Sequence, residues 1–215
     1  TGQDLDYVVS SEVFLAPIWI SKEVQKKFSI KIIVFLYQLV SIVRKFWGKV
    51  VFLVPQVRFI GTFLYNLTLQ TVGRYSRSNE NDYIAEYLGI PVNKIFPFDH
   101  HLTHAAAGYY ASLFHNEKAL VFTLDGEGDM HCSTVSIFEG KTIKRIAATS
   151  RENSLGNIYS GTTRFLGMKP GEDEYKVMGL APYAKERNVL KAYGKMRDII
   201  VLDPKDKLKF YAKFN

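Results

Sequence analysis

Apolar residues dominate the first third of the chain, and their spacing predicts mostly helix. A short strand is expected over residues 5–10, and Ser21 is placed to cap a helix that follows it. Residues 24–72 are dense in Phe, Ile, Leu, Val and Tyr. This stretch predicts several helices, because it is interrupted by residues that end or kink helices, namely Gly48, Pro55 and Gly61.

The pattern then changes between helical and strand-like spacing. Residues 80–88 predict a helix that ends at Gly89. A strand or loop over residues 94–98 leads into Asp99, which is placed to cap a helix over residues 100–112. The three alanines and the glycine of residues 105–108 would let another backbone approach that helix closely.

Strand-like spacing returns in the second half and predicts a three-stranded meander. The strands are expected over residues 119–125, 132–138 and 142–150, with turns at 126–129 and 139–141. The elements expected after the meander are a helix over 154–166 that ends at Gly167, a loop to Tyr183, and a basic helical tail over 185–215.

Charge is distributed unevenly along the 215 residues, which carry a net charge of +7. Residues 22–77 hold ten basic residues and one acidic residue, and residues 185–213 hold nine basic and four acidic residues. Residues 78–184 hold nine basic and thirteen acidic residues, so the part richest in motifs is acidic. Nucleic acid is therefore not the expected partner.

The basic, apolar stretch over residues 22–77 has two interpretations. Its uncharged apolar run over residues 32–43 is shorter than the roughly 20 residues that span a bilayer. A basic amphipathic helix on a membrane surface is one possibility, and a helical subdomain packed on the core is favoured over it. The single cysteine, Cys132, excludes an internal disulfide. Residues 1–30 do not have the pattern of a signal peptide, so we expect a cytoplasmic protein.

Three histidines occur in the sequence Asp-His-His-Leu-Thr-His over residues 99–104. On a helix His100 and His104 lie on the same face, where their ring nitrogens can converge on one ion, whereas His101 points elsewhere. The motif lacks the glutamate of the His-Glu-x-x-His zinc proteases, which argues against that chemistry. The alternative is a pair of surface histidines that bond only to their neighbours.

Two further segments have the composition of ligand loops. An apolar strand ends in Asp125-Gly126-Glu-Gly128, where backbone N–H groups could hold a phosphate and the aspartate could bind its metal. A plain hairpin is the alternative. In residues 171–183, Lys176 could contact a phosphate and Glu174 a ribose hydroxyl, or the segment could be a solvated charged turn.

Four motifs in order resemble the NodU/CmcH-type O-carbamoyltransferase family. They are Phe-Asp-His-His-Leu-Thr-His-Ala-Ala-Ala-Gly over 98–108, Phe-Thr-Leu-Asp-Gly-Glu-Gly-Asp over 122–129, Asn-Ser-Leu-Gly-Asn-Ile-Tyr-Ser over 153–160, and Glu-Tyr-Lys-Val-Met-Gly-Leu-Ala-Pro-Tyr over 174–183. The close match spans residues 79–184. Residue 184 is alanine where family members often have glycine.

The resemblance implies an α/β fold: a partial actin-like ATPase (RNase H-like) domain with an inserted basic helical subdomain. Residues 1–21 would end the first actin-like subdomain, 22–77 would form the insertion, 78–184 the metal- and nucleotide-binding core, and 185–215 the tail. It also implies a metal held by His100, His104 and Asp125, with iron, zinc and manganese all open. Nucleotide contacts are expected at Gly126, Gly128, Gly156, Glu174 and Lys176.

The activity implied by the resemblance is ATP-dependent. A carbamoyl group from carbamoyl phosphate would be activated as carbamoyl-adenylate and passed to a hydroxyl of a sugar or other small molecule. The family's early His-Asp pair, its later metal-binding aspartate and its YrdC-like C-terminal domain have no counterpart in these 215 residues. We therefore expect the chain alone to be inactive and to bind metal and nucleotide weakly. Alternatives are a non-catalytic nucleotide-binding or membrane-surface module, and a kinase-like phosphotransferase on the same fold.

Overall fold

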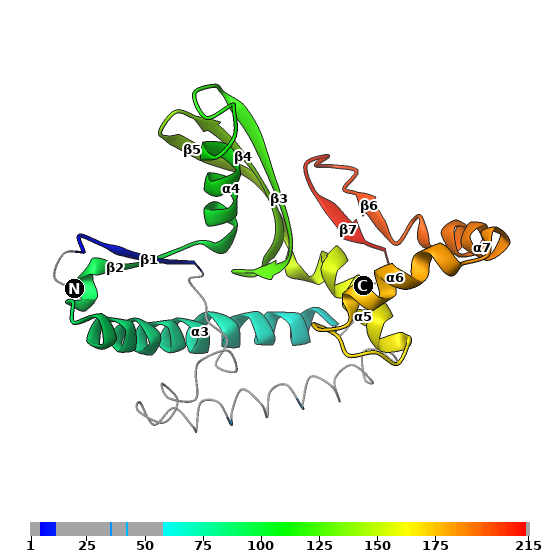
Figure 1. The fold of residues 1–215 in the computed structure, drawn as a ribbon, viewed down its shortest axis with the longest axis horizontal. Helices are drawn as coiled ribbons and strands as arrows, with labels where there is room; N and C mark the ends of the chain where they lie inside the picture. The colour runs from blue at the N-terminus through cyan, green and yellow to red at the C-terminus, as the bar shows by residue number, and fades with distance from the viewer. Residues whose placement is uncertain (1–4, 12–34, 36–41, 43–57, 214–215) are drawn as a thin grey trace. The chain divides into compact units, whose positions relative to one another are not determined.

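The computed structural model describes residues 5–11, 35, 42 and 58–213, and the helices expected within residues 24–57 lie outside this range. The described part is mixed α/β, as predicted. The chain divides into two compact units, residues 1–100 and 101–215. The division falls in the first turn of helix α4 (His100–Tyr110), which is labelled in Figure 1. Each unit is described by itself.

The first unit contains a long helix and a parallel strand pair. Strand β1 (Val8–Ser11) pairs with β2 (Ile95–Phe98), and helix α3 (Arg58–Leu88) precedes β2 through the short helix η4 (Val92–Lys94). The buried apolar residues between them come from the end of α3 and from the segment that follows it: Ala85, Ile90 and Ile95.

Helix α3 corrects one prediction about its sequence. The expected break at Gly61 does not occur, because the helix continues for 31 residues through both Gly61 and Gly73. A glycine costs a helix only about 1 kcal/mol relative to alanine, which the surrounding turns can offset. The helix also runs through residues 77 and 78. There Arg77 donates a hydrogen bond to the Ser11 carbonyl at 2.8 Å, which ties the helix to β1.

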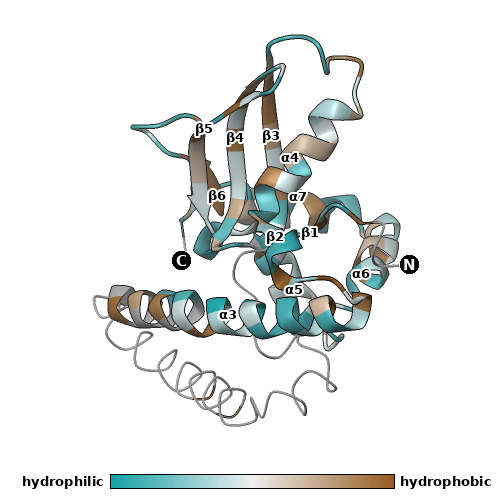
Figure 2. Cartoon of the chain, turned by 90° about the vertical axis from the view of Figure 1, so that its left-hand side faces the viewer, coloured by the Kyte–Doolittle hydropathy of each residue, from teal (hydrophilic) through white to brown (hydrophobic). Residues whose placement is uncertain are grey.

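The second unit is built on the predicted antiparallel meander. Helix α4 (His100–Tyr110) is followed by β3 (Ala119–Gly128), β4 (His131–Glu139) and β5 (Thr142–Ser150), in the order β3-β4-β5. Apolar residues are prominent along β3 (Figure 2), and one face of the sheet packs on α4. The core between helix and sheet contains Ala105, Tyr109 and Phe138.

The first hairpin differs from its prediction. The turn was expected at 126–129, but β3 extends to Gly128, which pairs with His131. The turn residues are Asp129 and Met130, whose φ angles are +45° and +71°. Two central residues with positive φ form the turn that matches the twist of a hairpin, although glycine and asparagine usually occupy it. The register shift between Leu124 and Gly128 is where the strand takes up the extra residues.

The rest of the unit contains helices and a second hairpin. After η5 (Arg151–Asn153) come α5 (Leu155–Phe165), α6 (Glu174–Leu180), η6 (Ala181–Tyr183) and α7 (Glu186–Met196). The helix expected over 154–166 is confirmed, and Gly167 ends it with a φ of +77°. The loop expected before Tyr183 is instead largely helical, because α6 forms there.

The tail is helical only in its first part. After α7, strands β6 (Ile200–Leu202) and β7 (Phe210–Ala212) form an antiparallel hairpin, which corrects the expectation of a helical tail over 185–215. The turn between the strands is stabilised by Asp203, whose carboxylate accepts from the backbone N–H of Lys205 at 2.7 Å. The hairpin is attached to η5, since the Ala212 N–H donates to Asn153 Oδ1 at 2.9 Å.

Candidate metal and nucleotide site

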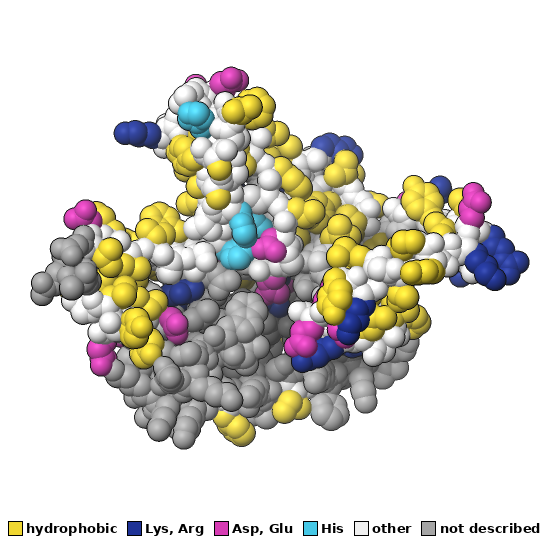
Figure 3. Space-filling view, viewed as in Figure 1, with side chains coloured by type: hydrophobic (Ala, Val, Ile, Leu, Met, Phe, Trp, Pro, Cys, Tyr) yellow, Lys and Arg dark blue, Asp and Glu magenta, His cyan; other side chains and the backbone are white. Residues whose placement is uncertain are grey.

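Helix α4 and strand β3 bring the predicted metal ligands together. Each of His100, His104 and Asp125 offers a ligand atom, and these atoms all lie within 4.8 Å of one another. His104 Nε2 is 3.3 Å from Asp125 Oδ2. Figure 3 shows histidine and acidic side chains gathered at one place on the visible face. The i, i+4 spacing on α4 and the end of a strand thus supply one compact donor set.

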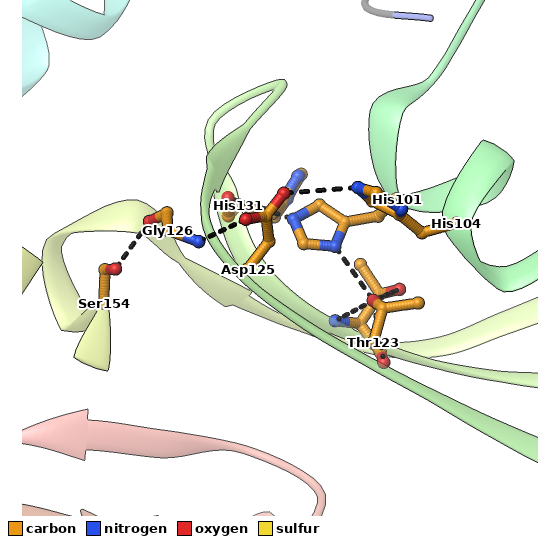
Figure 4. A network of polar contacts seen from close by, with 8 residues as sticks. His101, His104, Thr123, Asp125, Gly126, His131 and Ser154 are labelled. Carbon is orange, nitrogen blue, oxygen red and sulfur yellow. Dashed lines mark hydrogen bonds and ion pairs between the residues drawn. The ribbon is translucent and has the colours of Figure 1, made fainter. Parts of the chain in front are cut away.

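The second oxygen of Asp125 is held by the chain itself. Oδ1 accepts a hydrogen bond from the Gly126 N–H at 2.6 Å, while Oδ2 faces His104 (Figure 4). The Asp125 side chain is 36% exposed and that of His104 is 54% exposed. The carboxylate is therefore oriented by its own backbone, and the pair remains open to an ion from solvent.

The start of α5 lies against the backbone at Gly126. Ser154 caps α5 by accepting from the Asn157 N–H at 3.1 Å, and its hydroxyl donates to the Gly126 carbonyl at 2.5 Å. A Cβ on Gly156 would lie 2.8 Å from the Gly126 Cα, closer than real Cβ contacts allow. Only glycine at position 156 permits this approach. A Cβ at Gly126 would meet open space, so the chain itself does not require glycine there.

An open hollow of about 370 Å³ lies at this approach. Its lining comes from the end of β3 and the first turns of α5: Leu124, Asp125, Gly126, Leu155, Gly156 and Tyr159. Three of the residues predicted from sequence, Asp125, Gly126 and Gly156, thus share one hollow. Gly128 does not line it, because it is buried in the β3–β4 pairing opposite His131.

An ion pair with one buried partner holds the end of β3. The guanidinium of Arg151, which is 9% exposed, pairs with the Glu127 carboxylate. The Arg151 N–H also donates to the Met130 carbonyl at 3.0 Å. These contacts fix the segment between Asp125 and the hairpin turn against η5, directly before the residues that start α5.

Glu174 and Lys176 lie on α6 and contact the chain rather than the hollow. Glu174 Oε1 accepts from the Ser160 hydroxyl at 2.9 Å and from the Gly171 N–H at 2.8 Å. The Lys176 ammonium is 2.7 Å from the Asp173 carboxylate, which raises the pKa of Lys176. Tyr159 connects the two places, since its hydroxyl, from a residue that lines the hollow, donates to the Glu174 carbonyl at 3.4 Å. Their nucleotide contacts stay predictions.

The hydrogen bonds to Glu174 lead to a prediction about acid stability. The Gly171 N–H, followed by the Ser160 hydroxyl, lowers the pKa of Glu174 from its ordinary value of 4.5. A lowered folded-state pKa contributes stability above pH 4.5, and that contribution is lost as the pH falls through the folded-state value. We expect the free energy of unfolding of wild type to fall more steeply below pH 4.5 than that of Glu174→Gln. Urea unfolding between pH 7 and pH 3 measures the difference, and equal slopes would contradict it.

His101 lies next to the candidate metal ligands on α4, and the sequence did not predict its role. It is fully buried, and its Nδ1 is 2.8 Å from the Thr123 hydroxyl, while its Nε2 is 3.1 Å from the His131 carbonyl (Figure 4). The spacing of His101, Ala105 and Tyr109, four residues apart in each step, marks the buried face of α4 and was the available signal. His100 and His104, the i, i+4 pair that the sequence singled out, do not belong to this buried face.

Cys132 has no place in the candidate chemistry. It is buried on β4, and burial raises the pKa of its thiol to about 11. The thiol is therefore protonated at neutral pH, and a protonated thiol is a poor nucleophile and a poor metal ligand.

Comparison with known proteins identifies the family. The model of the carbamoyltransferase N-terminus family matches residues 43–207, which is more than half of the chain. This chain belongs to the carbamoyltransferase N-terminus family. The resemblance inferred from the four motifs is thereby confirmed.

Curated relatives are similar over shorter stretches. Nodulation protein NolNO of Sinorhizobium fredii is 35% identical over 120 residues, which is 54% of this chain and 17% of that protein. Nodulation protein NolO of Bradyrhizobium diazoefficiens is 42% identical over 85 residues, 40% of this chain and 15% of that protein. An uncharacterized protein of Methanocaldococcus jannaschii is 36% identical over 106 residues, 43% of this chain and 17% of that protein. The matched part of each relative is thus less than a fifth of its length.

A membrane-spanning helix is not found among the described residues. Within residues 58–213 and the shorter described segments, every helix is too short or too polar to cross a bilayer. The cytoplasmic location and the membrane-surface alternative stay predictions.

Proposed function

We propose that this chain is the metal- and nucleotide-binding portion of an ATP-dependent O-carbamoyltransferase. In the complete enzyme, carbamoyl phosphate and ATP would give carbamoyl-adenylate, and the carbamoyl group would pass to a hydroxyl of a sugar or other small molecule. Family membership supports carbamoyl transfer. The single observation that carries the rest is the cluster of His100, His104 and Asp125 beside the close approach of Gly126 and Gly156.

The donor set fits a metal ion. Two imidazoles and one carboxylate suit iron, zinc or manganese, and their candidate ligand atoms lie within 4.8 Å of one another. A bound ion would supply positive charge that stabilises phosphate oxygens and a leaving AMP. His100, His104 and Asp125 would hold the ion, and the Gly126 N–H would keep the carboxylate oriented toward it.

The chain's own groups also suit a nucleotide phosphate. The N-terminus of α5, capped by Ser154, opens into the hollow, and helix N-termini favour anions. Gly156 leaves this terminus without a side chain that would cover it. Lys176 would reach a phosphate only after leaving Asp173. Of the two Glu174 oxygens, Oε1 already accepts two hydrogen bonds from the chain, and Oε2 would be the one to contact a ribose.

The proposal includes an actin-like ATPase fold for residues 78–184, with residues 22–77 as a basic helical insertion and 185–215 as a tail. The β3–β4–β5 meander followed by α5 supports the proposal of an actin-like fold for residues 78–184. A hydroxyl-bearing acceptor and a YrdC-like domain that forms the adenylate belong to the same proposal.

Binding measurements on the wild-type chain test the proposal. We expect one Mn²⁺ or Zn²⁺ ion per chain, and a higher affinity for ATP when the ion is present. Calorimetric titration of the metal into the chain measures the number of bound ions, and titration of ATP into the metal-loaded and the chelator-treated chain measures the affinity for ATP. An affinity for ATP that is the same in the two states would contradict the proposed site.

A second assay separates carbamoyl transfer from phosphotransfer. In the full-length protein, labelled carbamoyl phosphate is expected to be consumed only together with ATP, and AMP is expected to form. Formation of ADP with transfer of the γ-phosphate, while carbamoyl phosphate remains, would instead support a kinase-like phosphotransferase.

A further inference from the structure

The buried histidine of α4 forms the centre of a polar network between helix and sheet. The backbone carbonyl of His131 can only accept, so His101 Nε2 must donate to it. Nδ1 of the neutral ring is then an acceptor, and the Thr123 hydroxyl donates to it at 2.8 Å. For the neutral ring this assigns the direction of both bonds and the tautomer.

The network continues into β4. The Thr123 hydroxyl has a second, more distant acceptor for its proton in the Thr134 carbonyl, at 3.4 Å. Its oxygen accepts from the Thr134 backbone N–H at 3.1 Å and lies 2.8 Å from the Thr134 hydroxyl, which donates to it when Thr123 donates to His101. His101 and Thr134 are 0% and 1% exposed, and Thr123 is 6% exposed. Replacing both residues by an apolar pair removes their mutual bond, but it also takes away these partners of the His131 carbonyl and of the Thr134 hydroxyl, which costs stability.

His101 and Thr123 are close in sequence to the predicted metal ligands. On α4, His101 is three residues before His104 and directly after His100. On β3, Thr123 is two residues before Asp125, and side chains two apart in a strand point to the same face. The His101–Thr123 bond therefore fixes the rotation and register of α4 on β3 at the point where the imidazole and the carboxylate must meet (Figure 4).

We propose that His101, through Thr123, is a positioning residue that sets the distance between the metal-binding histidines of α4 and Asp125 of β3. The inference rests on the proposed function, because it concerns the same metal site. A buried polar network that is fully hydrogen-bonded specifies one arrangement of the elements that it joins, whereas an apolar contact tolerates sliding and rotation. His101 acts through the elements and does not itself contact the ion.

Paired apolar substitutions test the inference. His101→Leu with Thr123→Val removes the bond between helix and strand, and we expect the affinity for Mn²⁺ to fall on the order of tenfold to 100-fold, as when the groups that orient metal ligands are removed. The visible absorption of bound Co²⁺ should also change, because it reports the ligand geometry. Thr123→Ser keeps the hydroxyl and is expected to retain wild-type affinity.

Tyr109→Phe is the matched control. Tyr109 is buried on the same helix, and its hydroxyl donates to the Glu117 carbonyl at 2.7 Å and accepts from the Gly140 N–H at 3.3 Å. This variant should lose stability without losing metal affinity. Wild-type affinity and an unchanged Co²⁺ spectrum in the folded double variant would overturn the inference.

Two further outcomes are decisive. If the double variant does not fold, Thr123→Val is compared with Thr123→Ser, and equal Mn²⁺ affinities in the two would overturn the inference. If the wild-type chain binds neither Mn²⁺ nor Co²⁺, the proposed metal site fails and the inference with it. Wild-type binding together with unaffected variants therefore distinguishes failure of the inference from failure of the proposed function.

Discussion

His104→Ala is expected to weaken the binding of Mn²⁺ to the chain by roughly 100-fold or more, since it removes a proposed direct ligand and even groups behind metal ligands cost 10- to 100-fold. The ion-free protein should be affected little. The His104 side chain is 54% exposed, and an exposed ion pair contributes about 0–1 kcal/mol. The expected result is an unchanged melting temperature without metal and loss of the increase that metal produces in wild type.

His115→Ala provides the control for this measurement. His115 is exposed after α4, where its Nδ1 lies 2.9 Å from the Ser112 carbonyl, and it is outside the cluster of His100, His104 and Asp125. Its loss removes one imidazole from the chain but should leave the metal-induced rise in melting temperature intact. Calorimetric titration and thermal unfolding with and without Mn²⁺ measure both variants. A rise in His104→Ala as large as that in wild type would show that the ion binds elsewhere.

The meander and its flanking helices could be predicted because their signals are local. The strand-like runs over 119–125 and 142–150 match β3 and β5, and the turn at Gly140 has the positive φ of +57° that favours glycine. The helix over 154–166 was marked at its start by Ser154, whose side chain caps it. Each of these elements is specified by residues within a few positions of its ends.

Helix α6 could not be predicted in the same way. Its surroundings, residues 171–183, place charged residues between two glycines, which is typical of a loop. Its stabilising contacts come from residues distant along the chain or in the preceding turn. Asp173 accepts from the Lys169 N–H at 2.8 Å, and Glu174 accepts from Ser160 of α5. Tertiary contacts of this kind override local propensity and are not visible in a short window of sequence.

In the candidate site, too, the part with a local signal could be predicted from sequence and the part held by distant residues could not. The i, i+4 pair of His100 and His104 is a local signal, and together with the family motifs it predicted a cluster that the structure brings within 4.8 Å. The hydrogen bonds of His101 to Thr123 and His131 join residues 22 and 30 positions away. A histidine that faces the core differs from one that faces a ligand only through such partners, so its role required the structure.

Gly156→Ala is expected to disrupt the start of α5 and to weaken ATP binding. The new Cβ would lie 2.8 Å from the Gly126 Cα, and a backbone atom cannot move aside by changing a rotamer. The helix start must therefore shift away from β3, which also lengthens the 2.5 Å bond from Ser154 to the Gly126 carbonyl. Overpacking of this kind costs about 1–3 kcal/mol of folding free energy. Urea unfolding measures that cost, and calorimetric titration of ATP measures the loss of affinity.

Gly161→Ala on the same helix separates the steric effect from the loss of a glycine. Gly161 is exposed, and a Cβ there meets nothing within 4 Å. Because alanine favours a helix interior by about 0.5–1 kcal/mol over glycine, this variant should be more stable than wild type and should bind ATP equally well. Opposite signs for the two substitutions are the expected result. If both substitutions destabilise the chain, the cause is the lost backbone freedom of glycine rather than the contact with Gly126. If both stabilise it, α5 does not approach β3 so closely.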